Sequence, residues 1–537
     1  MKPALLAEHA RWISQALVIP AVLATLLAGR VSSAAPDSPT DSDRAARLAA
    51  AHRQRRIIYD NDGNEPFFEM KGLTRNEFLE RRTAPLAGSQ VDTLIYCGNA
   101  GFGLSTRKTA VWNLHRFQAE PHTESKFGAL LDAGIDTLQV MVEFGHEHGM
   151  EVFTSIRMND THDAGASVLA RARIENTPFK KGHPERLLGT PLQRPRHGGW
   201  AAVNYARQDV QNSLFRYAEE AMVNYDLDGV HLDFFRHPVF FPSTAAGQLA
   251  TDEERRHMSK LLRRIRTRAD EIGRARNRPL LISVRVPDSA RYCHDIGLDL
   301  ENWLAEGLVD MLVVASYFQL NDWSVSADLG HRYKVPVYPS LDESRVPVEL
   351  DGKARNSPES FRARAAVALD SGCDGIATFN LFNPRSPIFR ECGDAAQLRQ
   401  LPRRYFASPI GLRKAAGGNL PTEAYCQIET LNPERPKPLI HSEPVSARLN
   451  LGAGFETLPG QRAALQLRFT GVVNPQQVQV TLNDQVQNLV PGEPGWLKSE
   501  LDVTSLKSGN NDVKVTLKEP VAPAAWTDLF LDIEPVP

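Results

Sequence analysis

The sequence has few of the features that mark metal, redox or nucleic-acid-binding proteins. Its 537 residues include only five cysteines and no CxxC spacing, which argues against a zinc site built on thiolates. Lysine and arginine total 62 against 64 for aspartate and glutamate, so the formal net charge of -2 gives no electrostatic case for a nucleic-acid partner. No glycine-rich phosphate loop follows an early strand-like segment. We therefore expect no cofactor, and any charged substrate must be recognised by local groups.

Long apolar runs are absent after residue 29. The one such run, residues 12–29, follows basic residues and precedes small residues at 32–35, where a signal peptidase would cleave. This arrangement predicts a signal peptide over 1–35, a secreted or periplasmic protein, and no membrane association after cleavage. An uncleaved anchor is the alternative, because the run is close to the length of a membrane span. Residues 36–54 are expected to form a flexible leader.

The five cysteines are scattered along the chain at Cys97, Cys293, Cys373, Cys392 and Cys426. An exported location permits a disulfide, and Cys373 with Cys392 is one pair to consider, although spacing does not establish connectivity. The odd number leaves at least one cysteine outside any such bond.

Short apolar segments alternate with amphipathic stretches between about residue 55 and residue 400. Eight segments have the character of buried strands: Arg55–Asp60, Val91–Cys97, Glu151–Met158, Gly229–Phe235, Leu280–Val286, Met311–Phe318, Pro336–Leu341 and Gly375–Phe382. Helical periodicity falls between them, at Arg75–Ala87, Glu124–His148, Gln208–Tyr225, Asp252–Arg276, Gly297–Glu306, Ser326–Tyr333 and Pro358–Ser371. This pattern predicts an α/β fold, a (β/α)8 TIM barrel over 55–405. A doubly wound open sheet is the alternative, but it lacks its usual glycine-rich loop here.

The character of the sequence changes after about residue 405. Polar and apolar residues alternate in 463–469, 477–482 and 512–517, which predicts antiparallel strands with one solvent-facing side. We therefore expect a linker over 406–423 and a jelly-roll-like accessory β-sandwich over 424–537.

The most informative segment is the fourth predicted strand and its exit, residues 228–238, with the sequence DGVHLDFFRHP. Alternation along a strand places His231 and Asp233 on the same face. A carboxylate at the end of a buried strand is costly unless it is paired or used, and barrel active sites lie where the strands end. Asp233 is therefore the first catalytic candidate, and the alternative is a residue that only caps the following loop.

Other strand ends bring acids, amides and aromatic residues to the same face of the barrel. Asp288, after the fifth strand, and Asp322, after the sixth, are candidate catalytic partners of Asp233. The candidate substrate-binding residues are Arg157, Asn159, Asp160, His162, His231, Arg236, Tyr317, Trp323, Asp342, Glu343 and Asn380. Carboxylates cleave glycosidic bonds, amides and arginines hold hydroxyl groups, and aromatic faces cover sugar rings. The inventory predicts a carbohydrate substrate. The long connection 160–207 is expected to form a lid or a subsite wall on this face.

A metal site is the competing interpretation, since the histidines and aspartates near Asp160 and Asp233 are expected at one end of the barrel. Metal-dependent hydrolases on barrels normally carry His-x-His at the first strand, and residues 55–62 contain no histidine. We therefore expect no metal.

Two segments, residues 151–160 (EVFTSIRMND) and residues 228–238, resemble the glycoside hydrolase-like family 10 group of exported bacterial proteins. In that group a third-strand R-M-N pattern and a fourth-strand D-G-(I/V)-H-L-D-aromatic-x-R-x-P pattern recur in a barrel. The resemblance covers roughly residues 55–400. It implies a carbohydrate-active barrel in which Asp233 is the carboxylate of strand four. The chain departs from the pattern at Phe235 and His237.

These observations lead to the hypothesis of an exported glycoside hydrolase that cleaves a poly- or oligosaccharide by acid/base chemistry. Asp233 would be the nucleophile or the base that activates water, and Asp288 or Asp322 the acid. One alternative is a non-catalytic carbohydrate-binding or scaffold barrel, and another is a metal-dependent polysaccharide deacetylase or amidase. The sugar, its linkage and the oligomeric state are left open by the sequence.

Overall fold

The computed structural model of the chain describes residues 40–116, 125–343, 346, 354–410, 421–472, 474–521 and 523–535. The predicted signal peptide and its cleavage site lie outside the described residues. Within those ranges, no helix combines the length and the hydrophobicity needed to cross a bilayer.

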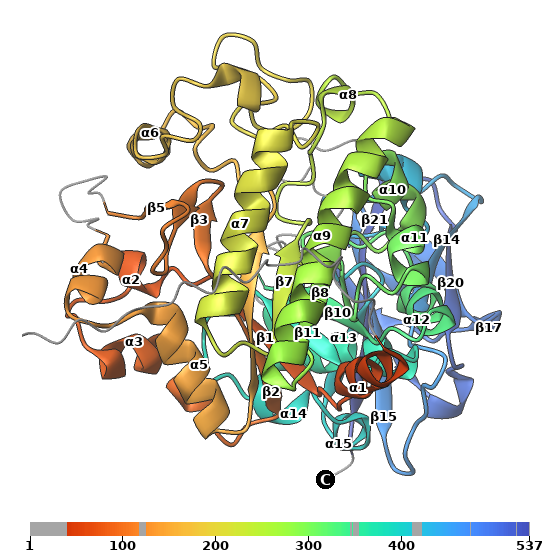
Figure 1. The fold of residues 1–537 in the computed structure, drawn as a ribbon. Helices are drawn as coiled ribbons and strands as arrows, with labels where there is room; N and C mark the ends of the chain where they lie inside the picture. Colours follow the sequence, from red (N-terminus) through yellow and green to blue (C-terminus); the bar gives the residue numbers. More distant parts are fainter. Residues whose placement is uncertain are drawn as a thin grey trace, which may run out of the picture. The chain divides into compact units, whose positions relative to one another are not determined.

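Eight parallel strands close into a barrel that is covered by helices (Figure 1). The strands are β1 (Ile57–Asn61), β2 (Val91–Cys97), β6 (Glu151–Arg157), β7 (Gly229–Asp233), β8 (Leu281–Val286), β9 (Met311–Val314), β10 (Val337–Asp342) and β11 (Ile376–Phe379). Each barrel strand pairs with the next along the chain and β11 returns to β1, which confirms the predicted (β/α)8 fold and leaves no open edge. Strands β7, β9 and β11 end earlier than predicted, at Asp233, Val314 and Phe379. Ala315 (φ +60°) and Asn380 (φ +53°) turn the chain out of the sheet directly after β9 and β11.

Helices fill the connections between these strands. They are α2 (Glu65–Phe68), α3 (Arg75–Arg82), α4 (Phe127–Asp132), α5 (Thr137–Glu147), α7 (Gln208–Asn224), α8 (Pro242–Ala245), α9 (Asp252–Arg276), α10 (Ala290–Asp295), α11 (Leu300–Ala305), α12 (Trp323–Arg332), α13 (Pro358–Asp370), α14 (Ile388–Glu391) and α15 (Ala395–Arg399). The single helix predicted over 124–148 is interrupted. Gly134, with φ +81°, ends the turn after α4, and the Asp136 side chain caps α5 by accepting a hydrogen bond from the amide of Leu138.

The interior of the barrel changes from apolar to charged along its axis. Neighbouring residues of β6, β7 and β8 form three successive layers in register: Phe153, Gly229 and Leu281, then Ser155, His231 and Ser283, then Arg157, Asp233 and Arg285. Gly229 is required in the first layer, because a Cβ there would lie 2.2 Å from a ring carbon of Phe153. The apolar layer closes the amino-terminal end of the barrel, and the ionic layer lies at the carboxyl ends of the strands.

The flexible leader predicted over 36–54 is wrong for residues 41–51, which form helix α1 (Asp41–Ala51). Thr40 and Asp43 form a capping box at its start. Arg47 forms ion pairs with Asp270 (3.2 Å) and Asp310 (3.1 Å), which attaches the helix to the barrel. The local composition did not predict this helix, because the residues that bind it lie more than two hundred residues away along the chain.

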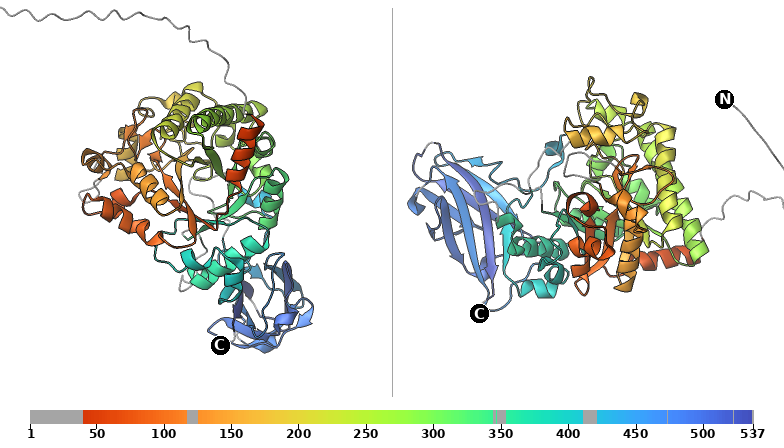
Figure 2. Two further views of the ribbon diagram at one scale, coloured as in Figure 1. Left: turned by 60° about the horizontal axis from the view of Figure 1, so that its bottom comes forward. Right: turned by 90° about the vertical axis from the view of Figure 1, so that its left-hand side faces the viewer.

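The C-terminal part forms two antiparallel sheets, coloured blue in Figure 2, as predicted. Their strands are β12 (Arg403–Phe406), β13 (Lys437–Pro438), β14 (Pro444–Asn450), β15 (Arg462–Thr470), β16 (Val478–Leu482), β17 (Gln485–Val486), β18 (Val490–Pro491), β19 (Trp496–Leu501), β20 (Asn510–Leu517) and β21 (Ala525–Glu534). Buried and exposed residues alternate along β15 and β20, so one face of each sheet packs into a shared apolar core. Strand β12 pairs with β21, although it lies almost wholly before the expected domain boundary after residue 405.

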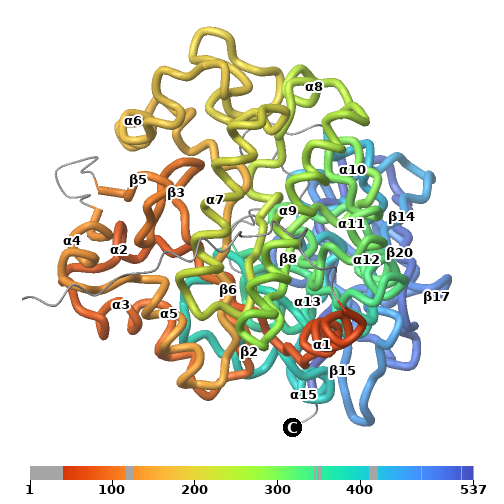
Figure 3. The backbone as a smooth tube through the Cα atoms, in the orientation of Figure 1, coloured from red at the N-terminus to blue at the C-terminus, as the bar shows by residue number. Residues whose placement is uncertain are grey.

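Two insertions build up the mouth of the barrel. A small sheet of β3 (Asn99–Gly101), β4 (Leu104–Ser105) and β5 (Asn113–Leu114) follows β2. The long connection after β6 carries helix α6 (Val168–Glu175), and its path can be seen in the backbone trace of Figure 3. These segments supply the walls of the site described next.

All five cysteines are free thiols. The disulfide considered between Cys373 and Cys392 is therefore not formed in the structure. Both residues are buried in the core of the barrel, where burial raises the pKa of each thiol and keeps it protonated.

Candidate active site

A buried ion pair lies at the centre of the barrel mouth. Asp233 ends β7 and stands in register beside Arg285 of β8. Arg285 Nε donates to Asp233 Oδ1 at 3.0 Å, and Nη2 of the same guanidinium donates to Oδ2. The backbone amides of Phe235 and Arg236 also donate to Oδ1, at 3.0 and 3.1 Å. Oδ1 is thus occupied by three donors, and Oδ2 is the less occupied oxygen.

These donors decide the charge of Asp233. Burial alone would raise the pKa of this carboxyl group, but the charge and hydrogen bonds of Arg285 outweigh it and the pKa is lowered. Asp233 is therefore ionised at neutral pH even though the residue is 1% exposed.

Asp60, at the end of β1, is the second carboxylate on the same guanidinium. Arg285 Nη1 donates to Asp60 Oδ2 at 2.6 Å. Burial raises the pKa of Asp60 to about 7, with Arg285 opposing the rise and the charges of Asp233 and Asp62 adding to it. Asp60 and Asp233 thus share one arginine and have pKa values shifted in opposite directions, the arrangement that separates an acid from a base.

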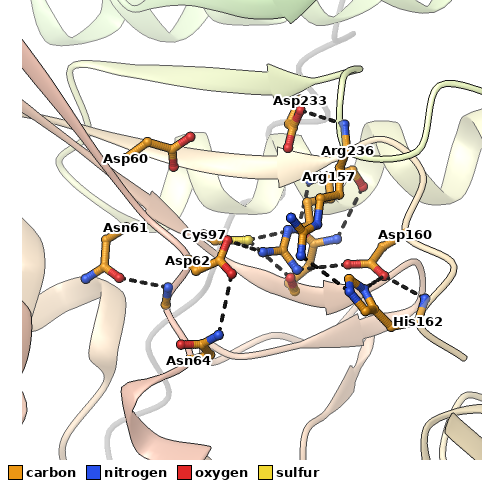
Figure 4. A network of polar contacts seen from close by, with 12 residues as sticks. Asp60, Asn61, Asp62, Asn64, Cys97, Arg157, Asp160, His162, Asp233 and Arg236 are labelled. Carbon is orange, nitrogen blue, oxygen red and sulfur yellow. Dashed lines mark hydrogen bonds and ion pairs between the residues drawn. The ribbon is translucent and has the colours of Figure 1, made fainter. Parts of the chain in front are cut away.

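A second charged network is centred on Arg157, the last residue of β6. Figure 4 shows Arg157 between Asp62 and Asp160, to which it donates from Nη2 and Nη1 respectively. Asp160 Oδ1 also accepts from the amide of His162, at 3.0 Å, and hydrogen-bonds to its Nδ1. Burial would raise the pKa of Asp62, but Arg157 and Arg236 lower it, so Asp62 is ionised.

An open cavity of about 160 Å³ lies against this second network. Asp62, Arg157, His162 and Arg236 line it, together with Arg173 of α6 from the long connection after β6. The remaining wall is partly apolar, with Phe67, Phe68, Phe127 and Leu169. Its size and mixed lining suit a small organic ligand such as a sugar unit.

One group at the mouth has the composition of a metal site. Ligand atoms of Asp160, His162 and His237 lie within 4.8 Å of one another. Two of the three residues are already engaged, however, since both oxygens of Asp160 have partners in Arg157 and His162, and Nε2 of His162 lies 3.3 Å from Nη2 of Arg236. Two neighbouring guanidinium groups also oppose a cation by charge repulsion.

Among the described residues, neither of the two acids predicted as partners of Asp233 shares a hydrogen bond or an ion pair with it. Asp288 is buried, and its Oδ2 accepts from the amides of Leu320 and Asn321, both at 2.8 Å, so that it fixes the loop after β9. Burial raises the pKa of Asp288 to about 6. Asp322 begins α12 and is half-buried; with Trp323 it lines a separate cavity bounded by residues of β12 and β14.

Two of the predicted substrate-binding residues, Asn159 and His231, make contacts that stabilise the fold at the barrel mouth or just below it. Asn159 donates to the carbonyl of Val239 (2.7 Å) and accepts from the amide of Val203 (3.0 Å), which joins two loops. His231 lies one layer below Asp233, fully buried, with Nδ1 2.9 Å from Ser283 Oγ. Burial and Arg285 lower the pKa of His231 to about 3, so it is neutral.

The other predicted residues border the mouth from β9, β10 and β11. The side chain of Tyr317 is buried, and Cζ of Arg236 lies over its ring, 5.5 Å from the ring centroid. Asp342 is the last residue of β10, and Glu343 follows it with a pKa raised by burial and by the charge of Asp342. Asn380 follows β11 with φ +53° and is partly exposed.

Sequence reasoning did not select Asp60, Asp62, Arg173 or Arg285 as site residues. Asp60 and Asp62 follow the first strand, and Arg285 faces inward on the fifth, so their places at strand ends were a usable signal. Arg173 had no such signal, because it lies on a helix inside a long connection.

Comparison with known proteins gives a likeness of fold. No family model matches the chain, and no curated protein matches it. Among solved structures, it is similar to alpha-L-fucosidase isoenzyme 2 from Paenibacillus thiaminolyticus (14% identity, TM-score 0.40, covering 64% of this chain and 48% of that one). It is also similar to the PgaB glycoside hydrolase domain from Bordetella bronchiseptica (10% identity, TM-score 0.41, covering 64% and 98%). A third similar structure is a cycloisomaltooligosaccharide glucanotransferase from Paenibacillus sp. (11% identity, TM-score 0.35, covering 89% and 57%).

These neighbours include glycoside hydrolases of several families. This chain spans about half the length of the fucosidase and of the glucanotransferase. The low identities and TM-scores limit the likeness to the type of fold, so the function has to be argued from the site. The resemblance to the glycoside hydrolase-like family 10 group stays a prediction.

Proposed function

We propose that this protein is a glycoside hydrolase that uses Asp60 as general acid and Asp233 as the ionised carboxylate. The observation that carries the proposal is the shared guanidinium of Arg285, which contacts both carboxylates at the ends of β1 and β7. One of them has a pKa raised to about 7 and the other a lowered pKa. Glycosidic hydrolysis requires such a pair, one protonated and one ionised at the same pH.

In this mechanism, protonated Asp60 gives its proton to the glycosidic oxygen as the bond to the leaving sugar breaks. Negative Asp233, through Oδ2, either attacks the sugar carbon that becomes positive or receives a proton from attacking water. Arg285 is a positioning residue, because it fixes both carboxylates and keeps Asp233 ionised. If Asp233 attacks the sugar, water then hydrolyses the glycosyl–Asp233 bond and gives its proton to the Asp60 carboxylate. If Asp233 instead takes the proton of water, it releases that proton to solvent, and Asp60 is reprotonated from solvent.

The substrate proposed is a poly- or oligosaccharide, because the cavity with arginines and phenylalanines is lined by Asp62, two residues after Asp60, and by Arg157, which stands in register beside Asp233. Export also remains a proposal, supported by the apolar run at 12–29 and the small residues after it. N-terminal sequencing of the protein recovered outside the cytoplasm should start just after residue 34 or 35. Recovery of the full-length chain from the membrane would overturn export by a cleaved signal.

The proposed activity is tested by incubating the protein with a panel of polysaccharides and detecting released oligosaccharides. Asp60→Asn and Asp233→Asn should each lower the rate at least a hundredfold, the lower range for loss of a catalytic proton carrier. Asp328→Asn, at an exposed position of α12, is the matched control and should keep full activity. Full activity in either of the first two variants on a substrate that the wild type cleaves would overturn the assignment.

A metal-dependent deacetylase or amidase is the second candidate, favoured by the cluster of Asp160, His162 and His237. It requires the ion to displace Arg157 from Asp160, which is why we place it second. Loss of activity on chelation, with recovery on adding a divalent ion, would favour this candidate. A non-catalytic scaffold is disfavoured, because it gives no reason for Asp60 and Asp233 to meet at one arginine.

A further inference from the structure

Two arginines at the cavity have no carboxylate partner among the residues that the structure describes. Arg236, after β7, has its Nη2 3.3 Å from Nε2 of His162, and its Nε is buried without a hydrogen-bond partner. Arg173, on α6, also has a buried Nε without a partner. A guanidinium carries five N–H donors, so both side chains hold donors that no described protein group uses.

The surrounding cations are all paired, which sets these two apart. Arg157 binds Asp62 and Asp160, Arg285 binds Asp60 and Asp233, and Lys180 binds Asp163 at 2.7 Å. A buried or half-buried charge without a partner is costly, and proteins keep such groups mainly where a ligand supplies the opposite charge.

The charge of the cavity wall points the same way. Arg157, Arg173 and Arg236 line it, and Asp62 is the one acidic side chain among the described residues of the wall. Burial lowers the pKa of both Arg173 and Arg236, and the positive charge of Arg157 lowers it further, while the negative charge of Asp160 opposes the shift in both. An anion between them would relieve both effects.

The rest of the wall suits a ring-shaped molecule. Phe67, Phe68 and Phe127 border the same cavity, and Phe68 is 56% exposed. An exposed aromatic face beside cationic donors is suited to a sugar ring that carries an acidic group.

We infer that this cavity is a subsite for an anionic sugar unit, whose carboxylate or sulfate is bound by Arg173 and Arg236. The inference rests on the proposed function, since it names the substrate class for the glycosidase site beside it. Guanidinium groups bind carboxylates and sulfates through paired N–H donors, which a lysine at the same place would not reproduce. A neutral glycan would leave both arginines without a counter-charge.

Binding of gel-immobilised glycans, measured by affinity electrophoresis, tests the subsite without requiring turnover. The probes are polygalacturonate, its methyl-esterified form as the uncharged match, and a sulfated galactan with its desulfated form. Retention by at least one acidic glycan and none by its uncharged match is the expected result. Retention should also weaken as salt is added.

Arg173→Gln and Arg236→Gln should each weaken binding roughly tenfold to one hundredfold, as expected for loss of a charge-assisted contact. Arg236→Lys should restore only part of the loss. Arg171→Gln is the matched control, because Arg171 lies on the same helix as Arg173 but is exposed and outside this cavity.

The outcomes separate the two proposals. Equal retention by acidic and uncharged glycans, retention by no acidic glycan, or unchanged binding in Arg173→Gln and Arg236→Gln overturns the anionic subsite. Selective binding that depends on both arginines, in a protein that cleaves none of the glycans it binds, supports the subsite and counts against hydrolysis. Preference for polygalacturonate over the sulfated galactan, or the reverse, identifies which acidic group is recognised.

Discussion

Replacing Asp60 with asparagine should change both the pH dependence of catalysis and that of stability. In the wild type, Asp60 has a pKa of about 7 in the folded protein against an ordinary value of 3.8. The folded state therefore holds this proton more tightly than the unfolded chain does. The resulting stabilisation is present at low pH and is lost as the pH rises through about 7.

The magnitude follows from the size of this shift. One pKa unit corresponds to about 1.4 kcal/mol, so proton linkage at Asp60 should cost the wild type roughly 3 kcal/mol of unfolding free energy between about pH 5 and about pH 8. The Asp60→Asn variant has no proton to lose and should lack this contribution. Distant groups titrate equally in both proteins. The neighbours Asp62 and Asp233 have lowered pKa values and are ionised throughout this range, so the difference between the two pH profiles reports on Asp60.

The assay is urea denaturation of the wild type and of Asp60→Asn across this pH range, with an infrared difference spectrum for the protonated carboxyl group. In parallel, kcat/KM of the wild type should fall as the pH rises through about 7, because the proton that Asp60 donates is lost. The variant should be slower by a factor of about 10² to 10⁴. Parallel stability profiles for the two proteins would refute a proton on Asp60, whatever the activity.

The structure supports three further predictions. Arg285→Gln should lower the free energy of unfolding by about 3–5 kcal/mol, measured by urea denaturation, because it leaves buried Asp233 without its partner. It should also shift the acidic limb of the pH–rate profile to higher pH, measured by kinetics. Asn159→Ala removes the link between the carbonyl of Val239 and the amide of Val203, so it should lower the free energy of unfolding by about 1–3 kcal/mol, measured by a thermal melt. Arg47→Ala should release α1 and make the segment 41–51 sensitive to proteases; resistance equal to that of the wild type would refute its attachment through Arg47.

The barrel was predictable because its signal is local. Each strand is a short apolar segment between polar turns, and the count of eight requires no knowledge of contacts. The sandwich was predictable for the same reason, from alternation in segments such as β15 and β20. Helix α1 was missed because its stabilising contacts to Asp270 and Asp310 come from distant parts of the chain.

The site was harder to predict, because strand ends contain more acids than one active site uses. Asp288 and Asp60 both follow a strand and look alike in sequence. In the structure, Asp288 accepts backbone amides and fixes a loop, whereas Asp60 contacts Arg285, 225 residues away. Only closure of the barrel brings β1 within reach of the arginine on β8, so no local pattern could choose between them.

The register of the charged layer explains why Asp233 can be both buried and ionised. Arg157 and Arg285 stand on either side of it on β6 and β8, so a negative charge on Asp233 lies between two positive ones. Asp60 shares Arg285 but bonds to one nitrogen only, and the charge on Asp233 works against a second negative charge beside it. Burial disfavours the charge of both carboxylates, and the single bond from Arg285 does not offset this effect at Asp60, so the proton goes to the less well bound of the two. The unequal bonding of the two carboxylates to Arg285, and not the position of Asp233 at a strand end, assigns the roles of acid and ionised partner.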